Sequence, residues 1–393
     1  MVIEKIALTN FKNIKSAVLN FSKNLNFLYG QNAQGKTNLL EAIYLCCVGK
    51  ISSHLDKDLV KKGEDEATIK LAGKKSDGRF LIEIKIDKSG KRFYLNELPV
   101  IKISQILGNL NAIYFSPHSL KLIKEAPFDR RKFLDIDLSQ LYTAYCAALL
   151  RYNKILIQRN NLLKTHGKAA LIDILSVWDT QLIKEGSFLI KKRSDFIKEL
   201  TPYIIKVHNF LTDNTEEIAV EYKTDLDIFD IENCYSDLLK EKLEKDICLG
   251  YTSVGPHKDD LKITLNNLDV KIFASQGQQR TVALSIKLAE VLYFYKITNE
   301  YPLLLLDDVL SELDLSRQKK LIEFSSNYQT LLTLTDIEEF KNLKDAFFLM
   351  FLTELLICMT KENYNCFFPF SFLIVQLWKV LLLFLLSCVF LLG

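Results

Sequence analysis

Residues 30–37 are the feature that most restricts how this chain can fold. They read GQNAQGKT and match G-x-x-x-x-G-K-[ST], the pattern of a phosphate-binding loop. An apolar strand-like stretch precedes the loop and an apolar helical stretch follows it, which is the context that the pattern requires. Four fixed positions match by accident on the order of once per hundred chains of this length. The sequence therefore predicts a nucleotide-binding α/β domain at the N-terminus.

The predicted roles within this loop follow from residue chemistry. Gly30 and Gly35 permit tight turns, so that backbone N–H groups and the helix N-terminus point at phosphate oxygens. Lys36 is expected to bind the β- and γ-phosphates of ATP, and the Thr37 hydroxyl to bind Mg²⁺. The predicted ATP-binding residues are Gly30, Gln31, Asn32, Ala33, Gln34, Gly35, Lys36 and Thr37.

A second motif, YPLLLLDDVLSELD at 301–314, is an apolar strand that ends in two carboxylates. Parallel α/β sheets bind ligands at the carboxyl ends of their strands. We expect Asp307 to bind Mg²⁺ and Asp308 to orient or deprotonate the attacking water. An acidic helix cap after a core strand is the alternative, and the loop at 30–37 makes it less favoured. The predicted catalytic residues are Lys36, Asp307 and Asp308.

Between these motifs, ASQGQQRT opens a long helix whose free N–H groups suit an anion. Each subunit has one predicted nucleotide site, at the loop 30–37, so its own chain supplies no second nucleotide for that helix to bind. A symmetric dimer, in which this segment caps the γ-phosphate held by the other subunit, is the economical arrangement. A plain helix cap is the alternative. The segment comprises Ser275, Gln276, Gly277, Gln278 and Gln279.

The remaining pattern predicts one α/β domain interrupted by helices. Strands are expected at 3–8, 16–21, 25–30, 80–87, 92–96 and 111–116, and long helices at 127–164 and 168–211, the second punctuated by Pro202. A hairpin is expected over Asn266-Asn267, with 270–273 in its second strand. The predicted parts are 1–116 and 246–345 for the two halves of the head, 117–245 for a helical arm, and 346–393 for a tail.

Charge and cysteine content restrict the partners and the compartment. The net charge of +3 is too small to indicate a nucleic-acid partner by itself. Any DNA-binding surface must therefore be a local basic patch. The eight cysteines form no CxxC pair and no secretory signal is visible, which favours reduced thiols in the cytoplasm. The five histidines lack metal-ligand spacing, so a metal other than Mg²⁺ is not expected. Basic clusters lie at 61–62, 74–75, 130–132 and 191–193.

The ordered set of motifs resembles the RecF family of recombination-repair ATPases, relatives of the SMC heads in the ABC class. The resemblance rests on GQNAQGKTN, FSPHSLKLIKEAPFDRRKFLD, GYTSVGPHKDDL, ASQGQQRT, LLLLDDVLSELD and LLTLTD. It runs from the first strand to about residue 345. It implies an ABC/SMC-like head with an inserted helical arm. It also implies an ATP-dependent homodimer that binds single- and double-stranded DNA at gaps beside RecR and RecO, assists RecA loading and supports the SOS response.

The resemblance also implies roles for individual residues. Ser275 to Gln279 match the ABC signature segment. Thr335 and Asp336 stand where many ABC ATPases have a switch histidine. Phe115-Ser116-Pro117 falls near the expected glutamine loop and contains no glutamine. Because of these two departures we expect a slow, weak, DNA-stimulated ATPase. Arg130 and Arg131, with Lys132, match paired arginines beside the insert and are DNA-binding candidates whose role is alternatively intramolecular. The D-loop would comprise Ser311, Glu312, Leu313 and Asp314.

The tail does not follow this resemblance. Its last part, 370–392, is 23 residues of nearly unbroken apolar sequence, long enough for a bilayer. Lys379 near its middle would cost about 2.5–3.5 kcal/mol in a membrane. We favour a shifted reading frame or abnormal terminus over a membrane anchor or a buried extra element.

Two other functions remain open at this stage. A membrane-tethered ABC-type transport ATPase would use the tail, but the helical insert between loop and signature argues against it. A non-catalytic scaffold would bind ATP only to dimerise. Substitution of Asp308 separates the scaffold from an ATPase.

Overall fold

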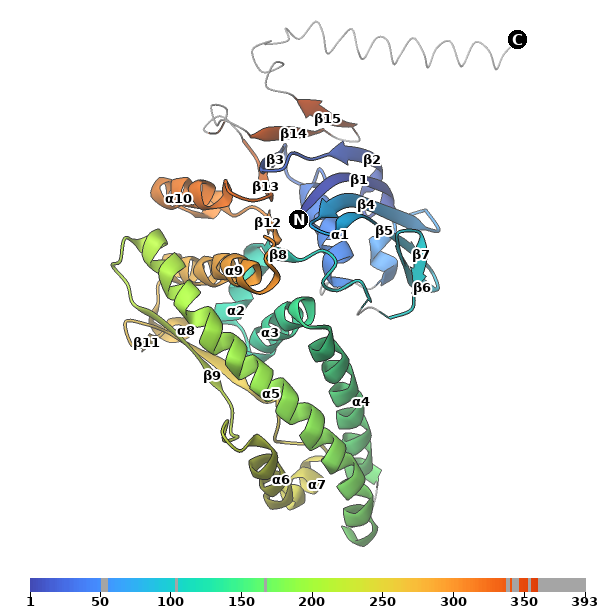
Figure 1. The fold of residues 1–393 in the computed structure, drawn as a ribbon, viewed down its shortest axis with the longest axis vertical. Coiled ribbons are helices and arrows are strands. Elements are labelled where there is room, and N and C mark those ends of the chain that lie inside the picture. The colour runs from blue at the N-terminus through green and yellow to red at the C-terminus, as the bar shows by residue number, and fades with distance from the viewer. Residues whose placement is uncertain are drawn as a thin grey trace, which may run out of the picture.

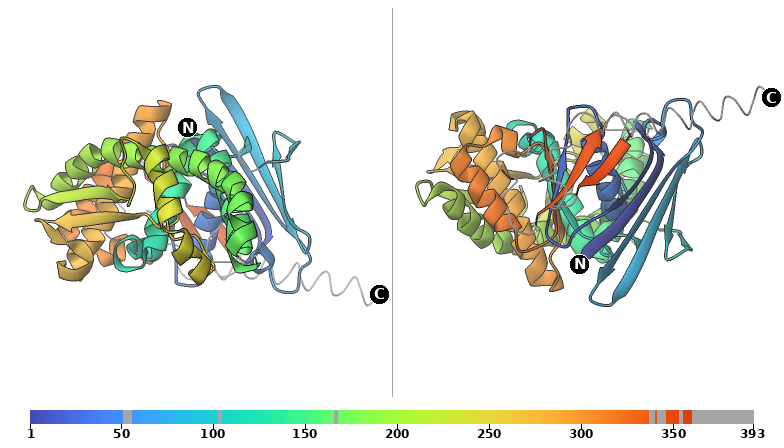
Figure 2. Two further views of the ribbon diagram at one scale, coloured as in Figure 1. Left: turned by 90° about the horizontal axis from the view of Figure 1, so that it is seen from below. Right: turned by 90° about the horizontal axis from the view of Figure 1, so that it is seen from above.

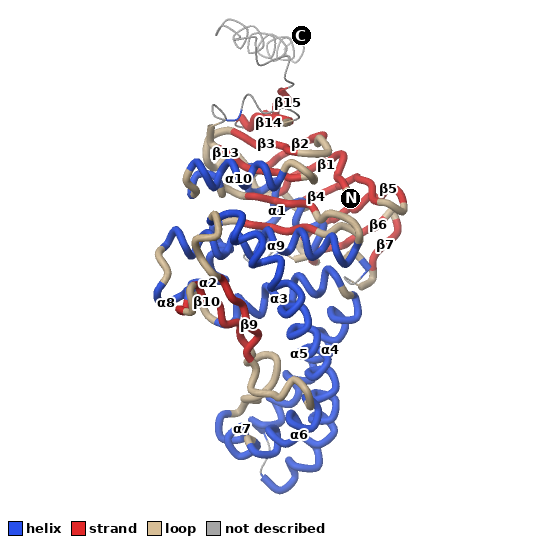
Figure 3. Tube along the Cα trace, turned by 60° about the vertical axis from the view of Figure 1, so that its left-hand side comes forward, coloured by secondary structure: helices blue, strands red, loops and turns tan. Residues whose placement is uncertain are grey.

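The computed structural model describes residues 1–50, 56–102, 105–165, 168–336, 340, 346–352 and 355–359. The chain forms a head, in which strands predominate, and an arm of long helices that extends from it (Figures 1 and 3). Figure 2 shows the antiparallel sheet of the head as a layer to one side of the other elements. The predicted α/β domain with a helical insert is confirmed at this level.

Three sheets contain the strands of the described residues. The antiparallel sheet has the order β2-β1-β4-β5-β6-β7, the mixed sheet β15-β14-β3-β13-β12-β8 and the small sheet β11-β10-β9. The strands are β1 (Val2–Phe11), β2 (Ile14–Asn20), β3 (Leu25–Tyr29), β4 (Ala67–Lys75), β5 (Gly78–Asp87), β6 (Gly90–Leu95), β7 (Leu98–Val100), β8 (Ala112–Phe115), β9 (Ile218–Lys223), β10 (Asp260–Leu265), β11 (Leu268–Asp269), β12 (Leu303–Leu306), β13 (Thr330–Leu334), β14 (Phe347–Leu352) and β15 (Leu355–Met359).

The helices are distributed between the head and the arm. They are α1 (Lys36–Val48), α2 (Lys121–Lys124), α3 (Pro127–Leu141), α4 (Thr143–Thr165), α5 (Lys168–Thr212), α6 (Ile231–Glu241), α7 (Leu243–Leu249), α8 (Val270–Phe273), α9 (Gln276–Thr298) and α10 (Leu315–Ser325). Short 3-10 helices are η1 (Asp56–Leu59), η3 (Pro117–Leu120) and η4 (Leu310–Glu312).

The mixed sheet is buried on both faces. Its strands β3, β12 and β13 are buried at every position, as expected for parallel strands covered by helices. Alternate residues separate into two cores: Leu304 and Leu332 pack with α9, whereas Leu305 and Leu331 pack with α1 and the antiparallel sheet. Because successive side chains of a strand point to opposite faces, the mixed sheet lies between α9 on one side and α1 with the antiparallel sheet on the other.

Two elements differ from the sequence prediction. The helix expected at 127–164 is broken at Tyr142, where φ is −135° and the chain turns from the head into the arm. The helix expected at 168–211 is confirmed, and α5 continues through Pro202. Leu200 and Ile204 are buried on either side, and their packing offsets the roughly 3 kcal/mol cost of an interior proline. Residues 270–273 form helix α8, not a strand, because Asp269 caps the N–H of Lys271.

The head continues into the predicted tail. Strand β14 pairs in parallel with β3, and β15 pairs with β14 at the sheet edge. Within the described ranges, no helix is both long and apolar enough to cross a bilayer. The apolar span 370–392, on which the anchor and frame-shift hypotheses rest, lies outside the described residues.

A buried charged cluster joins three helices of the head and the arm base. Asp137 of α3 and Glu290 of α9 are 2% and 0% exposed, and their carboxyl groups interact with each other. Burial raises the pKa of both groups, Lys287 Nζ lies 2.9 Å from Glu290 Oε2, and Tyr44 of α1 interacts electrostatically with the pair. Folding therefore favours the protonated form of these carboxyl groups.

This cluster predicts a pH-dependent effect of Glu290→Gln. A carboxyl pKa raised by folding gives stability at low pH that is lost as pH rises, because the folded state binds the extra proton. Glutamine can donate to Asp137 and accept from Lys287 without that proton. We expect thermal unfolding near that of the unsubstituted chain at about pH 6, and a higher Tm than the unsubstituted chain at about pH 9.

The control is Glu290→Leu, which abandons both polar partners. We expect it to destabilise the fold by about 3–5 kcal/mol, as breaking a buried charge pair does. A Tm difference between Glu290→Gln and the unsubstituted chain that is the same at both pH values would contradict a raised pKa of Glu290.

Candidate nucleotide-binding site

The loop at 30–37 has the backbone that its glycines predict. Gly30 has φ +146° and Gly35 has φ +103°, values that side chains other than hydrogen rarely allow. A Cβ on Gly30 would also lie 2.4 Å from the carbonyl oxygen of Phe351 in β14. Gly35 is the N-cap of α1, so the first N–H groups of that helix open onto the loop. The loop is thus shaped for close backbone approach to an anion.

Lys36 points back into this loop. Its Nζ donates to the carbonyl oxygens of Gly30 at 2.6 Å and Gln31 at 2.8 Å. Burial lowers the pKa of the ammonium, while Asp308 and Asp307 act in the opposite direction. A desolvated cation beside free helix N–H groups is a strong point of attraction for phosphate.

Asp307 is the most connected side chain of the site. Its Oδ1 accepts from Thr37 at 3.0 Å and from Thr333 at 2.9 Å. Its Oδ2 accepts from the Tyr114 hydroxyl at 3.2 Å. Burial raises the pKa of Asp307, and these three hydrogen bonds oppose that rise. The structure therefore brings together Thr37 and Asp307, which are 270 positions apart in the sequence.

Asp308 is exposed and its backbone is left-handed, with φ +51°. Its N–H donates to Thr333 Oγ1 at 2.8 Å, and its Oδ1 accepts from Ser311 at 2.8 Å. A non-glycine residue in this region costs on the order of 1–3 kcal/mol, and such strain tends to gather at functional sites. The turn places Asp308 on the wall of the same hollow as Asp307.

The loop and the two aspartates line one cavity of about 180 Å³. Asn32, Ala33, Gly35, Lys36, Thr37, Asn38, Asp307, Asp308, Thr333, Leu334 and Thr335 form its wall. Thr37 and Asp307 present two hard oxygen atoms side by side, which is the donor set that Mg²⁺ uses with substrate phosphates. Among the described residues, no cluster of three His, Cys, Asp or Glu could hold a metal ion. The predicted Mg²⁺ ligands therefore fit a metal shared with a nucleotide.

The segment Ser275 to Gln279 is not part of this cavity. Ser275 caps α9, because its Oγ accepts a hydrogen bond from the N–H of Gln278 at 3.3 Å. The side-chain oxygen of Gln278 in turn accepts from the N–H of Ser275 at 2.9 Å. Gly277 is exposed, and a Cβ placed on it would meet nothing within 4 Å. Gln276 is exposed and Gln279 is buried. The segment is thus a capped helix start that faces outward.

The predicted D-loop connects this helix to the strand that carries the aspartates. Arg280 of α9 forms an ion pair with Glu312 at 3.2 Å. Ser311 bonds Asp308, and Asp314 caps α10 by accepting from the N–H of Arg317. Leu313 is half-buried, and Thr335 and Asp336 are exposed after β13, with Thr335 on the cavity wall.

The three DNA-binding candidates occupy different environments. Arg130 is 7% exposed and forms a bidentate pair with Asp260, at 2.5 Å and 2.9 Å, so its guanidinium is committed within the chain. Arg131 donates to the carbonyl oxygen of Asp259 at 2.8 Å and is half-buried. Lys132 is also half-buried. For Arg130 the intramolecular alternative is the one that this structure favours.

Sequence reasoning missed two residues that orient Asp307. Thr333 lies inside the apolar strand β13 and Tyr114 inside β8. A polar group within a buried strand needs a partner, which is the signal that could have identified both. The partner itself could not be found, since it depends on which strands are neighbours.

The comparisons place these features in a family. The chain matches the RecF/RecN/SMC N terminal domain over residues 2–354. It is 43% identical over 347 residues to the DNA replication and repair protein RecF of Lachnoclostridium phytofermentans, covering 87% of this chain and 95% of that protein. The RecF of Acetivibrio thermocellus is 44% identical over 354 residues, with 87% and 95% covered.

Two solved structures show how far the fold extends. The recombination mediator protein RecF-ATP in the RecFOR pathway is similar with a TM-score of 0.83 and 33% identity, over 91% of this chain and 97% of that chain. The Smc head domain from Pyrococcus furiosus has a TM-score of 0.54 and 17% identity, over 92% and 97%, a likeness of fold alone. The predicted ABC/SMC-like head with an inserted helical arm is confirmed, and the chain belongs to the RecF family.

Proposed function

We propose that this chain is an ATP-dependent DNA-binding protein of recombinational DNA repair and replication. The observation that carries the proposal is the hydrogen bond between Thr37 and Asp307, which assembles the loop and the aspartate strand into one phosphate-sized site. Relatives named as DNA replication and repair proteins, and a similar structure named for its ATP complex, support the same assignment. Its place of action is the cytoplasm.

The chain's own groups supply the chemistry of the ATP step. The N–H groups of 30–37 and the start of α1 hold phosphate oxygens, and Lys36 neutralises charge on the β- and γ-phosphates. Asp308 accepts a proton from the attacking water or orients it. Asp308 is one methylene shorter than a glutamate. The exposed Thr335 lies on the cavity wall at the position where many ABC ATPases have a switch histidine. We therefore expect slow hydrolysis that acts as a switch.

Mg²⁺ would be held by Thr37 and Asp307 and would supply charge neutralisation on the phosphates. Tyr114 and Thr333 keep the Asp307 carboxylate in one orientation through their hydrogen bonds. Because Asp307 is buried, these partners offset the cost of keeping it ionised.

The active form is a homodimer in this proposal. The outward-facing start of α9 has free N–H groups and no nucleotide of its own chain beside it. In a symmetric dimer each copy of Ser275 to Gln279 would contact the γ-phosphate bound by the other copy. ATP then controls dimerisation. The dimer binds DNA at single-strand gaps and duplex junctions, together with RecR and RecO. By binding there it assists RecA loading and supports the SOS response.

ATP turnover of the full chain with different DNA additions tests the function. We expect low turnover without DNA, stimulation by duplex or gapped duplex, and loss of stimulation when salt is raised, because phosphate contacts weaken with salt. Turnover that is indifferent to every DNA at low salt would contradict a DNA-repair ATPase and favour the transport alternative.

Asp308→Asn separates an ATPase from an ATP-binding scaffold. Asparagine preserves size and the Ser311 hydrogen bond but cannot accept the proton. We expect turnover to fall by about 10²–10⁴, as loss of a general base does, and the ATP-bound dimer to persist in light scattering. The matched control is Asp237→Asn on the exposed surface of α6, with no expected change. Unchanged turnover of Asp308→Asn would favour the scaffold.

A further inference from the structure

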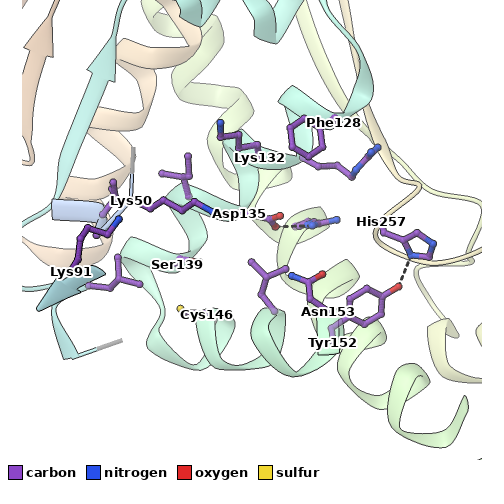
Figure 4. A pocket seen from close by; sticks show the side chains of 17 residues that line it. Lys50, Lys91, Phe128, Lys132, Asp135, Ser139, Cys146, Tyr152, Asn153 and His257 are labelled. Atoms are coloured by element: carbon purple, nitrogen blue, oxygen red, sulfur yellow. Dashed lines mark hydrogen bonds and ion pairs between the residues drawn. The ribbon is translucent and has the colours of Figure 1, made fainter. Parts of the chain in front are cut away.

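A second hollow of the molecule is separate from the ATP site. A cavity of about 830 Å³ lies where the head meets the base of the arm. Figure 4 shows Lys50 and Lys91 on one side of it and Phe128, Lys132 and His257 on the other. Its volume falls in the range of small-molecule and cofactor sites, about 300–1,000 Å³.

Cations approach this cavity from two helices. Lys50 follows α1 of the head, and Arg131 and Lys132 lie on α3. Burial lowers the pKa of Lys132, as does its proximity to Lys50 and Lys121, while Asp129 opposes these effects. Within the described part of the chain, neither Lys50 nor Lys132 forms an ion pair. Two lysines held close together favour the binding of an anion, and Asp129 opposes part of that effect at Lys132.

The other polar groups of the cavity are already satisfied. Asp135 accepts from Arg193 at 2.7 Å and from Tyr145 at 2.6 Å, so its charge is balanced internally. His257 is bonded to Tyr152 at 2.6 Å and to the Thr252 carbonyl oxygen at 2.9 Å. Burial lowers the pKa of His257 to about 4, so it is neutral near pH 7. Lys91 pairs with Asp56 at 2.8 Å. The positive charge of the cavity thus comes mainly from Lys50 and Lys132, because Arg131 interacts with Asp135, Asp259 and Asp260.

Apolar side chains form much of the remaining wall, beside the polar Ser139 and Asn153. Leu107, Ile136 and Leu149 line it, and Phe128 stands at it with 65% of its surface exposed. An exposed phenylalanine beside lysines and an arginine fits a ligand that has both a flat ring and a phosphate. A carboxylate-rich peptide would use the cations but would gain nothing from the Phe128 ring.

We infer that this cavity is a second nucleotide site, in which Lys50, Arg131 and Lys132 hold one phosphate and Phe128 stacks on the base. The nucleotide is either free or one unit of a nucleic-acid strand. Since Lys50 follows α1 and Lys132 lies on α3, an occupant would tie these two helices together. The strand case rests on the proposed DNA-binding function, whereas the free-nucleotide case does not.

Binding to the full chain carrying Lys36→Met tests this inference, because that substitution weakens the loop at 30–37. The probes are thymidine 5′-monophosphate, thymidine, and a fluorescein-labelled hexathymidylate followed by anisotropy. We expect Phe128→Ala and Lys132→Ala each to weaken binding by about tenfold, as loss of one stacked base or one phosphate contact does.

Matched controls separate the cavity from general surface effects. Phe229→Ala removes a fully exposed ring elsewhere, and Lys124→Ala removes an exposed charge on α2 outside the cavity. We expect both to change binding less than about twofold, as surface substitutions do. Equal losses in variants and controls, or no loss in either cavity variant, would overturn the site.

The probes distinguish the two sources of the nucleotide. Competition by thymidine 5′-monophosphate but not thymidine supports a free nucleotide. Binding of the hexathymidylate alone, with the same dependence on Phe128 and Lys132, supports a strand. A polyglutamate peptide that binds with this dependence while neither nucleotide probe does would overturn the nucleotide assignment. These outcomes are independent of DNA-stimulated ATP turnover, so failure of one proposal is distinguishable from failure of the other.

Discussion

The shared register of the parallel strands is the constraint on which the site depends. Tyr29 pairs with Leu334, Leu332 with Leu306, and Leu306 with Phe115, so four strands end at one edge. The loop at 30–37, Asp307 and Thr335 therefore emerge beside one another although they are far apart in the sequence. Thr37 and Asp307 are joined at 3.0 Å because that register holds. A slip of one residue would exchange the side chains that face the two cores and would separate Thr37 from Asp307.

The sequence predicted the loop, the aspartate strand and the helical insert because each has a strong local pattern. The glycines at 30 and 35 and the apolar run before Asp307 need no tertiary information. What could not be predicted depends on neighbours in space. Thr333 and Tyr114 act on Asp307 only because β13 and β8 flank β12. Arg130 is an internal ion-pair partner because β10 brings Asp260 to α3, and Pro202 is tolerated because α5 is anchored by buried residues on both sides.

Packing contacts and an ion pair link α5 and α9 to the strand that carries the aspartates of the ATP site. Helix α9 packs on α5 and the mixed sheet, and Arg280 pairs with Glu312 after the aspartate strand. Asp137 of α3 and Glu290 of α9 interact with each other. Strand β14, within the predicted tail, pairs with the strand that leads into the loop, and its Phe351 carbonyl closes over Gly30. Truncation after residue 345 would therefore remove support from the ATP site itself.

The composite site between two copies is the central claim, and mixing two inactive variants tests it most directly. Lys36→Met removes phosphate binding, so alone it should lose ATP-driven dimerisation and turnover. Ser275→Arg leaves the loop intact and blocks the segment that would face the partner's nucleotide. An equal mixture forms one intact site from the loop of one copy and the signature of the other. The account predicts that ATP turnover reappears in the mixture. Turnover no greater than the sum of the two variants measured separately would contradict it.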